Sequence, residues 1–286
     1  MTRPLAGLAD IADRYDVLLC DVWGVIHNGR EAFPVPCAAL SRWRRERGPV
    51  ILVSNSPRPA NGVADQMDAL GVPREAWSGL VTSGDVTRDL LAARAPGPAW
   101  KIGPERDAPL YEGLGLAFGD LESADFIVCT GPNDDETETP EDYRADLARC
   151  VARDLEMICA NPDKVVQRGE RLIPCAGALA DLYKDLGGLV IMAGKPFAPI
   201  YDLALARAET LMDRPLERRR ALVIGDGVAT DLMGAQIQDL DALFIASGIH
   251  GADAIGSDDV LEMATVAALL AAGGARAAFA MAELSW

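Results

Sequence analysis

The chain has six cysteines but no Cys-x-x-Cys pair, and most of the cysteines lie inside apolar segments. Structural zinc sites and disulfide frameworks usually draw on closely spaced cysteines, so neither is expected here. We predict reduced thiols buried in the core, as in a cytoplasmic protein. The cysteines stand at positions 20, 37, 129, 150, 159 and 175.

Long hydrophobic runs and positive charge are also scarce. The longest apolar stretch, around residues 263–272, is too short and too rich in alanine to span a bilayer, and residues 1–16 lack the hydrophobic centre of a signal peptide. The 27 basic residues against 43 acidic ones give a formal net charge of −16. Nucleic acid and membranes are therefore not expected partners, and an anionic substrate must be attracted locally.

What is present is a repeated alternation of apolar strands with amphipathic helices in a chain of 286 residues, half of them apolar. This alternation predicts an α/β fold with a doubly wound parallel sheet covered on both faces. The segment Ala95-Pro96-Gly97-Pro98 resembles a linker, after which the pattern restarts.

Three terminal or capping signals give local predictions. Residues 5–15 have helical spacing, and the alanine-rich residues 275–286 predict a helix that packs on the core or on a second subunit, so a homodimer is one alternative. Thr139, Pro140 and Asp142 form a helix start, with Thr139 as the N-cap of a box-like arrangement.

Polar residues follow four of the predicted strands. Ligands of open α/β sheets bind beyond the carboxyl ends of the strands, so these side chains should converge at one edge. Each one alone has an ordinary explanation, because a strand-end aspartate can cap a helix and Gly-Lys-Pro can form a turn. Their order on alternating strands favours a shared site. They are Asp21, Ser54 with Asn55, Lys195, and Asp226 with Asp231.

The residue types at this edge suit a phosphate and a metal ion. Asp21 and Asp226 offer the oxygen ligands that Mg²⁺ prefers. Lys195 and the Ser54 hydroxyl suit the phosphate. The glycines at positions 24 and 227 allow close backbone approach and offer N–H donors.

These residues resemble the four motifs of the haloacid dehalogenase-like superfamily, namely a nucleophilic Asp, a Ser or Thr, a Lys and an acidic Gly-Asp-x-x-x-Thr-Asp. The matching positions are Asp21, Ser54, Lys195 and residues 225–231. The chain is more closely similar to class IIA, the NagD-type phosphatases, through residues 159–163, 174–179 and 194–196 as well. The resemblance implies a Rossmann-like catalytic core of residues 1–84 and 191–286, with an inserted α/β cap domain of residues 85–190.

The resemblance also implies a mechanism for a phosphatase acting on a small phosphorylated metabolite such as a sugar phosphate or nucleotide. Asp21 would attack phosphorus and form an aspartyl-phosphate. Mg²⁺ would bridge Asp21, Asp226 and the main-chain carbonyl of Trp23. Asp231 would orient Lys195 or a metal-bound water. The groups implied to hold the phosphate are Lys195, Ser54, and N–H groups near Asn55, Gly24 and Gly227.

Trp23 departs from the family pattern, because it stands where the family has a second Asp that donates and accepts protons. An indole N–H only donates, and loss of a general acid–base typically costs ~10²–10⁴ in rate. Three alternatives follow. The substrate has a leaving group that needs no proton; His27 replaces the acid; or the chain is an impaired phospho-ligand-binding or regulatory protein, with Trp23 stacked on a ring of the ligand.

Overall fold

The structure is a computed structural model that describes residues 2–168, 171–249, 254–256 and 260–286. It divides the chain into two compact units, which are described separately. Unit 1 comprises Met1–Ser54, Asn61–Val81 and Lys195–Trp286, and unit 2 comprises Asn55–Ala60 and Thr82–Gly194.

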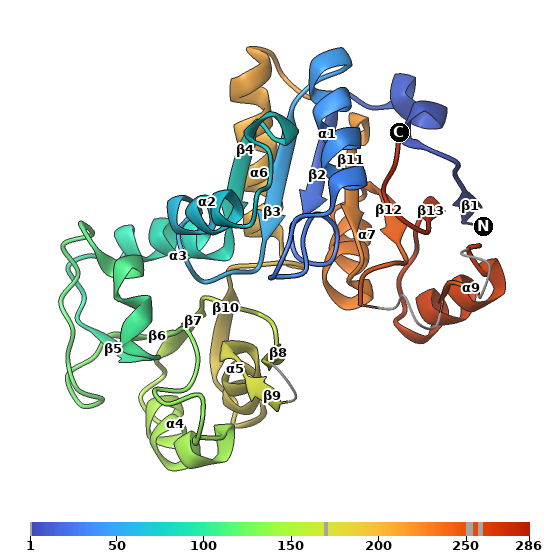
Figure 1. The fold of residues 1–286 in the computed structure, drawn as a ribbon. Coiled ribbons are helices and arrows are strands. Elements are labelled where there is room, and N and C mark those ends of the chain that lie inside the picture. The colour runs from blue at the N-terminus through green and yellow to red at the C-terminus, as the bar shows by residue number, and fades with distance from the viewer. Residues whose placement is uncertain (1, 169–170, 250–253, 257–259) are drawn as a thin grey trace. The chain divides into compact units, whose positions relative to one another are not determined.

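Unit 1 is built on a seven-stranded sheet with the order β1-β13-β12-β11-β2-β3-β4. Neighbouring strands from β1 across to β3 pair in parallel, and both ends of the chain contribute to the sheet (Figure 1). The strands are β1 (Arg3–Pro4), β2 (Val17–Asp21), β3 (Val50–Ser54), β4 (Gly79–Thr82), β11 (Ala221–Gly225), β12 (Asp241–Ile245) and β13 (Phe279–Met281).

The central strands of this sheet are apolar along their length. The residues of β2 and β3 are buried up to the last one, and those of β11 are buried throughout. Continuous apolar runs of this kind suit parallel strands covered on both faces. Figure 1 shows α1 (Pro34–Glu46) in front of the sheet and α6 (Ala198–Met212) behind it, and both contact β3. The predicted doubly wound α/β fold is confirmed.

Shorter helical segments complete the first unit. They are the 3₁₀ helices η1 (Leu8–Arg14), η2 (Arg74–Ala76) and η5 (Arg218–Arg220), the π-helical turn η6 (Val228–Leu232), and the α-helices α2 (Ala60–Ala69, whose first residue belongs to unit 2), α7 (Met233–Ile237) and α9 (Met263–Ala272).

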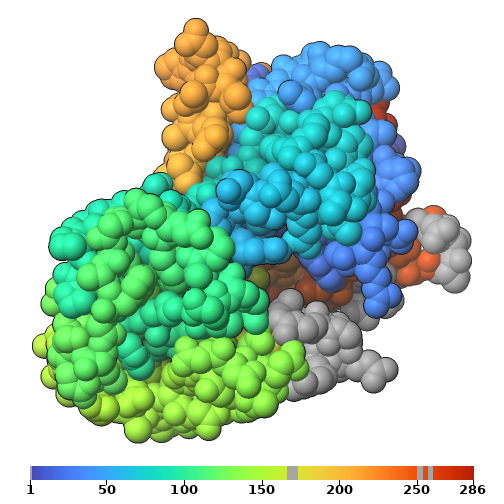
Figure 2. All heavy atoms as spheres, turned by 60° about the vertical axis from the view of Figure 1, so that its left-hand side comes forward, coloured from blue at the N-terminus to red at the C-terminus, as the bar shows by residue number. Residues whose placement is uncertain are grey.

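Unit 2 has a four-stranded parallel sheet with the order β10-β7-β6-β5 and a two-stranded antiparallel sheet of β8 and β9. Its side chains pack into a compact body, largely green in Figure 2. The strands are β5 (Ala99–Ile102), β6 (Phe126–Cys129), β7 (Glu156–Cys159), β8 (Val165–Arg168), β9 (Arg171–Pro174) and β10 (Leu189–Met192). The helices are α3 (Ser83–Ala92), η3 (Glu105–Tyr111), η4 (Pro140–Tyr143), α4 (Arg144–Val151) and α5 (Ala176–Asp185).

Two capping boxes start helices of unit 2. The Thr82 side chain accepts from the Asp85 N–H while the Asp85 carboxylate accepts from the Thr82 N–H, which satisfies two donors at the start of α3. The predicted box of Thr139 and Asp142 is also present, although the helix opens with the 3₁₀ turn η4 before α4.

The two predictions for the chain ends need correction. The alanine-rich C-terminal segment contains the strand β13, which pairs in parallel with β12 and β1, so the predicted helix is wrong. Sheet pairing outweighs the local helical preference of alanine there. At the other end, the predicted helix of residues 5–15 is the shorter 3₁₀ helix η1.

The cysteine prediction is confirmed, because all six cysteines are free and buried. Within the described residues, no helix is both long enough and apolar enough to cross a membrane.

Candidate active site

The candidate site lies at the carboxyl edge of the unit 1 sheet. Asp21 is the last residue of β2 and pairs in register with Val53, the residue before Ser54 at the end of β3. Cys20 pairs with Ile224 of β11, which is followed by Gly225 and Asp226. Because the strands are parallel and in register, three of the predicted residues emerge from the sheet at the same edge.

Lys195 is the centre of the polar contacts at this edge. Its Nζ donates to Oδ1 of Asp21 at 2.5 Å, to Oδ1 of Asp231 at 2.8 Å and to the carbonyl of Val53 at 3.0 Å. Burial would lower the pKa of Lys195, but the two carboxylates raise it well above its usual value. Lys195 is therefore a buried ammonium that holds two carboxylates in place.

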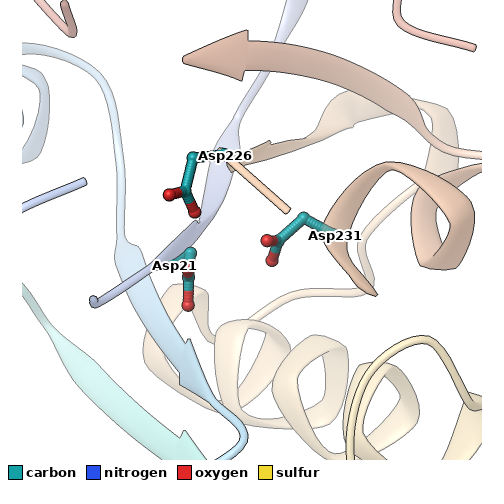
Figure 3. A group of neighbouring side chains, drawn as sticks. All are labelled: Asp21, Asp226 and Asp231. Atoms are coloured by element: carbon teal, nitrogen blue, oxygen red, sulfur yellow. The ribbon is translucent and has the colours of Figure 1, made fainter. Parts of the chain in front are cut away.

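Asp21, Asp226 and Asp231 form a compact acidic cluster (Figure 3). Each offers one oxygen, and these oxygens lie within 4.8 Å of one another. Burial and then repulsion between the carboxylates raise the pKa of each side chain to about 6, although Lys195 acts in the opposite direction. The cluster therefore holds negative charge at a free-energy cost.

The charge balance of the cluster suits a divalent cation. Three carboxylates and one ammonium leave two negative charges without compensation when all four groups are ionised. Closely spaced carboxylate oxygens are the donors that hard cations such as Mg²⁺ and Ca²⁺ take. The donor set of this chain therefore fits a divalent metal ion.

Two glycines make room for Asp226. A Cβ atom at Gly24 would lie 2.2 Å from Oδ2 of Asp226, and one at Gly248 would lie 2.0 Å from the same atom. Gly24 also has a positive φ of 84°, which side chains disfavour. Oδ2 of Asp226 accepts from the N–H of Ile249 at 2.7 Å. The close approach expected of Gly24 is thus present, with Asp226 as the neighbour.

The N–H groups of Gly24 and Gly227, which were expected to donate to a phosphate, donate to protein acceptors in this structure. The N–H of Gly24 donates to the carbonyl of His27 at 2.8 Å, and that of Gly227 donates to Oδ2 of Asp231 at 3.1 Å. Both donors close local turns in this structure. Their contribution to phosphate binding stays a prediction.

Asn55 follows Ser54 in the chain and belongs to unit 2. Its Nδ2 donates to Oδ1 of Asp163 at 2.9 Å, and its side chain is buried. Asp163 lies in the segment 159–163 that is similar to class IIA, and its contact with Asn55 spans 108 residues of sequence. No spacing rule could have paired the two residues.

Trp23 and His27 lie in the turn after β2. Trp23 is 53% exposed, whereas His27 is 3% exposed. Nδ1 of His27 accepts from the N–H of Gly29 at 3.0 Å, and burial lowers the pKa of the ring. A buried, neutral imidazole whose Nδ1 already accepts a hydrogen bond is a poor proton donor at neutral pH. The structure therefore disfavours His27 as a replacement acid.

Comparisons with known proteins agree on one family. A profile described as haloacid dehalogenase-like hydrolase matches residues 18–117, and a second, HAD-hydrolase-like profile matches residues 192–272. A crystal structure of a haloacid dehalogenase-like hydrolase from Brucella suis 1330 is 46% identical to this chain, with a TM-score of 0.82, and covers 99% of this chain and 100% of that one.

Two further relatives carry named activities. Ribonucleotide monophosphatase NagD of Escherichia coli (strain K12) is 25% identical over 248 residues, 84% of this chain and 91% of that protein. The crystal structure of a Mycobacterium tuberculosis glycerol phosphate phosphatase in complex with calcium is 26% identical, with a TM-score of 0.63, and covers 86% of this chain and 71% of that one. The chain therefore belongs to the NagD-type haloacid dehalogenase-like hydrolases, as its four motifs together with residues 159–163, 174–179 and 194–196 predicted.

Proposed function

We propose that this protein is a Mg²⁺-dependent phosphatase that hydrolyses a small phosphorylated metabolite. The observation that carries the proposal is Lys195 Nζ, buried between the carboxylates of Asp21 and Asp231, with Asp226 in the same cluster. Two named relatives are phosphatases, one for ribonucleotides and one for glycerol phosphate. A buried ammonium beside a strand-end carboxylate suits the binding and attack of a phosphoryl group.

Asp21 is the proposed nucleophile. One carboxylate oxygen forms a bond to phosphorus while the bond from phosphorus to the leaving oxygen breaks, which gives an aspartyl-phosphate. Water then attacks the same phosphorus and the bond to Asp21 breaks, which regenerates the Asp21 carboxylate. Inorganic phosphate leaves with the oxygen of the water, and one proton of the water passes through solvent to the leaving oxygen. The bond of Lys195 to Oδ1 fixes the orientation of the Asp21 carboxylate before attack.

Lys195 and Ser54 are the proposed phosphate ligands of the chain. The ammonium of Lys195 neutralises charge on the phosphoryl oxygens, and the Ser54 hydroxyl donates to one of them. Asp231 keeps Lys195 in position, and its other oxygen accepts from the Gly227 N–H. We assign Asp231 to positioning for this reason.

Asp21, Asp226 and the main-chain carbonyl of Trp23 are the proposed ligands of Mg²⁺. When bound, the ion supplies charge neutralisation between the carboxylate cluster and the phosphate. Only the main-chain carbonyl of residue 23 would bind the ion, and the indole ring would not take part. A Trp at position 23 is therefore compatible with the metal site.

Unit 1 is the proposed catalytic core and unit 2 the proposed cap. This assignment corresponds to a core of residues 1–84 and 191–286 and a cap of residues 85–190, except that residues 55–60, 82–84 and 191–194 pack with unit 2. A cap that carries its own binding groups would supply contacts to the organic part of the substrate.

Trp23 supports a second candidate function, a phospho-ligand-binding protein with little turnover. The exposed indole offers a flat apolar surface and one N–H donor but no exchangeable carboxyl group. If the chain is an enzyme, it should favour substrates whose leaving group needs no proton, such as acyl and aryl phosphates.

Phosphate release tests the proposal. Acetyl phosphate, p-nitrophenyl phosphate, glycerol phosphate and AMP are each incubated with the protein with and without Mg²⁺, and Asp21→Asn is the control. We expect Mg²⁺-dependent release that the substitution abolishes, with acetyl phosphate fastest. Equal release by both proteins from every compound would overturn the proposal and leave the binding function.

A further inference from the structure

Tyr201 is a buried tyrosine of unit 1 to which the proposed mechanism gives no role. It lies on α6, which begins at Ala198, shortly after Lys195 in the chain, and it is 1% exposed. Its hydroxyl donates to the main-chain carbonyl of Asp231 at 3.4 Å. Asp231 belongs to the π-helical turn η6, 30 residues further along the chain. Tyr201 therefore connects the segment that follows Lys195 to the turn that carries Asp231.

Two contacts join these two segments. Lys195 Nζ donates to Oδ1 of Asp231, and Tyr201 Oη donates to the main-chain oxygen of the same residue. The first contact holds the carboxylate, and the second holds the backbone that carries it. Burial and then the charge of Asp231 raise the pKa of Tyr201, whereas Lys195 lowers it. The phenol therefore lies close to the charged groups of the site, although it is not among the proposed ligands of phosphate or metal.

The other contacts of Asp231 shape its own turn. Oδ2 accepts from the Gly227 N–H at 3.1 Å and from the Thr230 hydroxyl at 3.3 Å. The N–H groups of Asp231 and Leu232 both donate to the carbonyl of Gly227, which gives the wide turn of a π-helix. All these partners lie within or next to η6, so they do not fix the place of the turn against α6. The hydroxyl of Tyr201 supplies such a contact.

Gly234 leaves the space that the Tyr201 hydroxyl occupies. A Cβ atom at Gly234, which lies in α7, would be 2.0 Å from Oη and 2.6 Å from Cζ of Tyr201. Glycine within a helix is less stable than alanine. The close approach of the phenol gives a physical reason for glycine at this position, and it shows that the end of the ring is packed on a second side.

The position of Asp231 matters because of the way in which Lys195 is bound. The ammonium has three protons and donates to Oδ1 of Asp21, to Oδ1 of Asp231 and to the Val53 carbonyl. A phosphoryl oxygen that binds Lys195 takes the place of one of these acceptors. If it replaces Asp21, the nucleophile, then Asp231 and Val53 hold the ammonium during attack. A misplacement of about 1 Å in such a group can cost on the order of 10² in rate.

We infer that the hydroxyl of Tyr201 positions the phosphoryl-transfer site, because it holds the Asp231 turn against α6 and so keeps Lys195 in the place that attack requires. The inference rests on the proposed function, since it names a further residue of the same site. Tyr201 contacts neither phosphate nor metal in this arrangement. Its loss should therefore lower the rate of turnover and leave substrate binding and Mg²⁺ binding unchanged.

Tyr201→Phe tests the inference, because it removes the hydroxyl and keeps the ring. With acetyl phosphate and Mg²⁺, kcat should fall about tenfold while KM changes by less than about twofold, and the rise in Tm that Mg²⁺ causes should stay the same. The matched control is Tyr183→Phe. Tyr183 is also fully buried, and its hydroxyl donates to a main-chain carbonyl, that of Leu155 at 2.6 Å, within unit 2. Both substitutions should lower Tm, but only Tyr201→Phe should lower kcat.

Gly234→Ala is a second probe of the same contact. The added Cβ displaces the Tyr201 hydroxyl from the side of α7, although the substitution leaves the tyrosine in the chain. It should lower kcat for acetyl phosphate with KM unchanged, as Tyr201→Phe does. An unchanged kcat in both folded variants would overturn the inference. An equal fall of kcat in Tyr183→Phe, or a fall of kcat/KM that comes from KM alone, would overturn it as well.

Failure of the proposed function is distinguishable, because wild type would then release no phosphate in a way that depends on Asp21. In that case a double-mutant cycle on stability decides. The fall in Tm caused by Tyr201→Phe should be about half as large in a Lys195→Met background as in wild type, because the contact between Lys195 and Asp231 is already lost there. The fall caused by Tyr183→Phe should be the same in both backgrounds. Equal falls for Tyr201→Phe in both backgrounds would overturn the inference.

Discussion

The ammonium of Lys195 and the carboxylate of Asp21 meet at 2.5 Å, although 174 residues of sequence separate them. Both side chains are nearly buried, with 4% and 12% of the side chain exposed. Removing one partner from a buried pair is strongly destabilising because it leaves an uncompensated charge. The site should therefore respond to the loss of Lys195 in both stability and activity.

Lys195→Met should lower the free energy of unfolding by about 3 kcal/mol and phosphatase activity by at least about 10². Denaturant unfolding and phosphate release measure the two effects. Lys184→Met is the control, because Lys184 is partly exposed and its 3.8 Å pair with Asp181 lies on the surface. That pair should contribute less than about 1 kcal/mol. Equal effects of the two substitutions would contradict the role given to Lys195.

Mg²⁺ should raise the Tm of the wild-type protein, and by more at pH 7.5 than at pH 5.5. The pKa values of the three cluster aspartates are about 6, so protons compete with the ion below that pH. A ligand present at 100 times its Kd stabilises by about 2.7 kcal/mol. Thermal unfolding with and without Mg²⁺ measures the shift. An equal shift in Asp226→Asn would place the ion elsewhere.

Without divalent metal, the cluster should make the protein more stable as the pH falls through 6. A folded pKa of about 6 against an ordinary value of 3.8 means that the folded state binds protons more readily in this window. Asp226→Asn should therefore stabilise the metal-free protein at pH 7.5 by on the order of 1–2 kcal/mol, a gain that shrinks towards pH 5.

The quantity to measure is the difference in stability between wild type and Asp226→Asn at each pH. His27 affects the pH dependence of stability in the direction opposite to that of the aspartates. Burial lowers the pKa of His27, so the folded state resists its protonation as the pH falls. This effect is the same in wild type and Asp226→Asn and cancels. If the pH profiles of Tm of the two proteins in EDTA are parallel, the ionised Asp226 carboxylate does not destabilise the metal-free protein, which would contradict the prediction.

Gly24→Ala should reduce Mg²⁺ binding and activity, because the new Cβ would lie 2.2 Å from Oδ2 of Asp226 and the position has a positive φ. Gly62→Ala is the control. Gly62 lies in α2 with no other atom within 4 Å of an added Cβ, so alanine there should stabilise by roughly 0.5–1 kcal/mol. A Gly24→Ala protein with wild-type Mg²⁺ affinity would contradict the packing argument.

Sequence alone predicted the parts of the site that follow from strand order. Asp21 and Ser54 end apolar strands and Asp226 follows one, so their convergence could be inferred from parallel topology. The hydrogen bond from Lys195 to the carbonyl of Val53 could not be inferred from the sequence. Every residue has a main-chain carbonyl, so the residue type at position 53 does not indicate the contact. The same limit applies to the Gly24 N–H, whose acceptor is a carbonyl three residues ahead.

The C-terminal strand shows where local patterns fail. Phe279–Met281 lies in an alanine-rich segment with helical preference, and its pairing with β12 and β1 depends on segments far away in sequence. The contact of Tyr201 with the main-chain carbonyl of Asp231 is a similar case, since it joins α6 to η6 across 30 residues of sequence. Tertiary packing, which single-sequence patterns do not encode, decides both.

The most direct test of the central claim is the Trp23→Asp variant, assayed for phosphate release with Mg²⁺. If the acidic cluster and Lys195 form an intact phosphoryl-transfer site that lacks only a proton donor, the variant should hydrolyse glycerol phosphate about 10²-fold faster than wild type and acetyl phosphate at a similar rate. The double variant Asp21→Asn with Trp23→Asp should lose the gain. No gain for any alkyl phosphate in a folded variant that binds Mg²⁺ would contradict the claim.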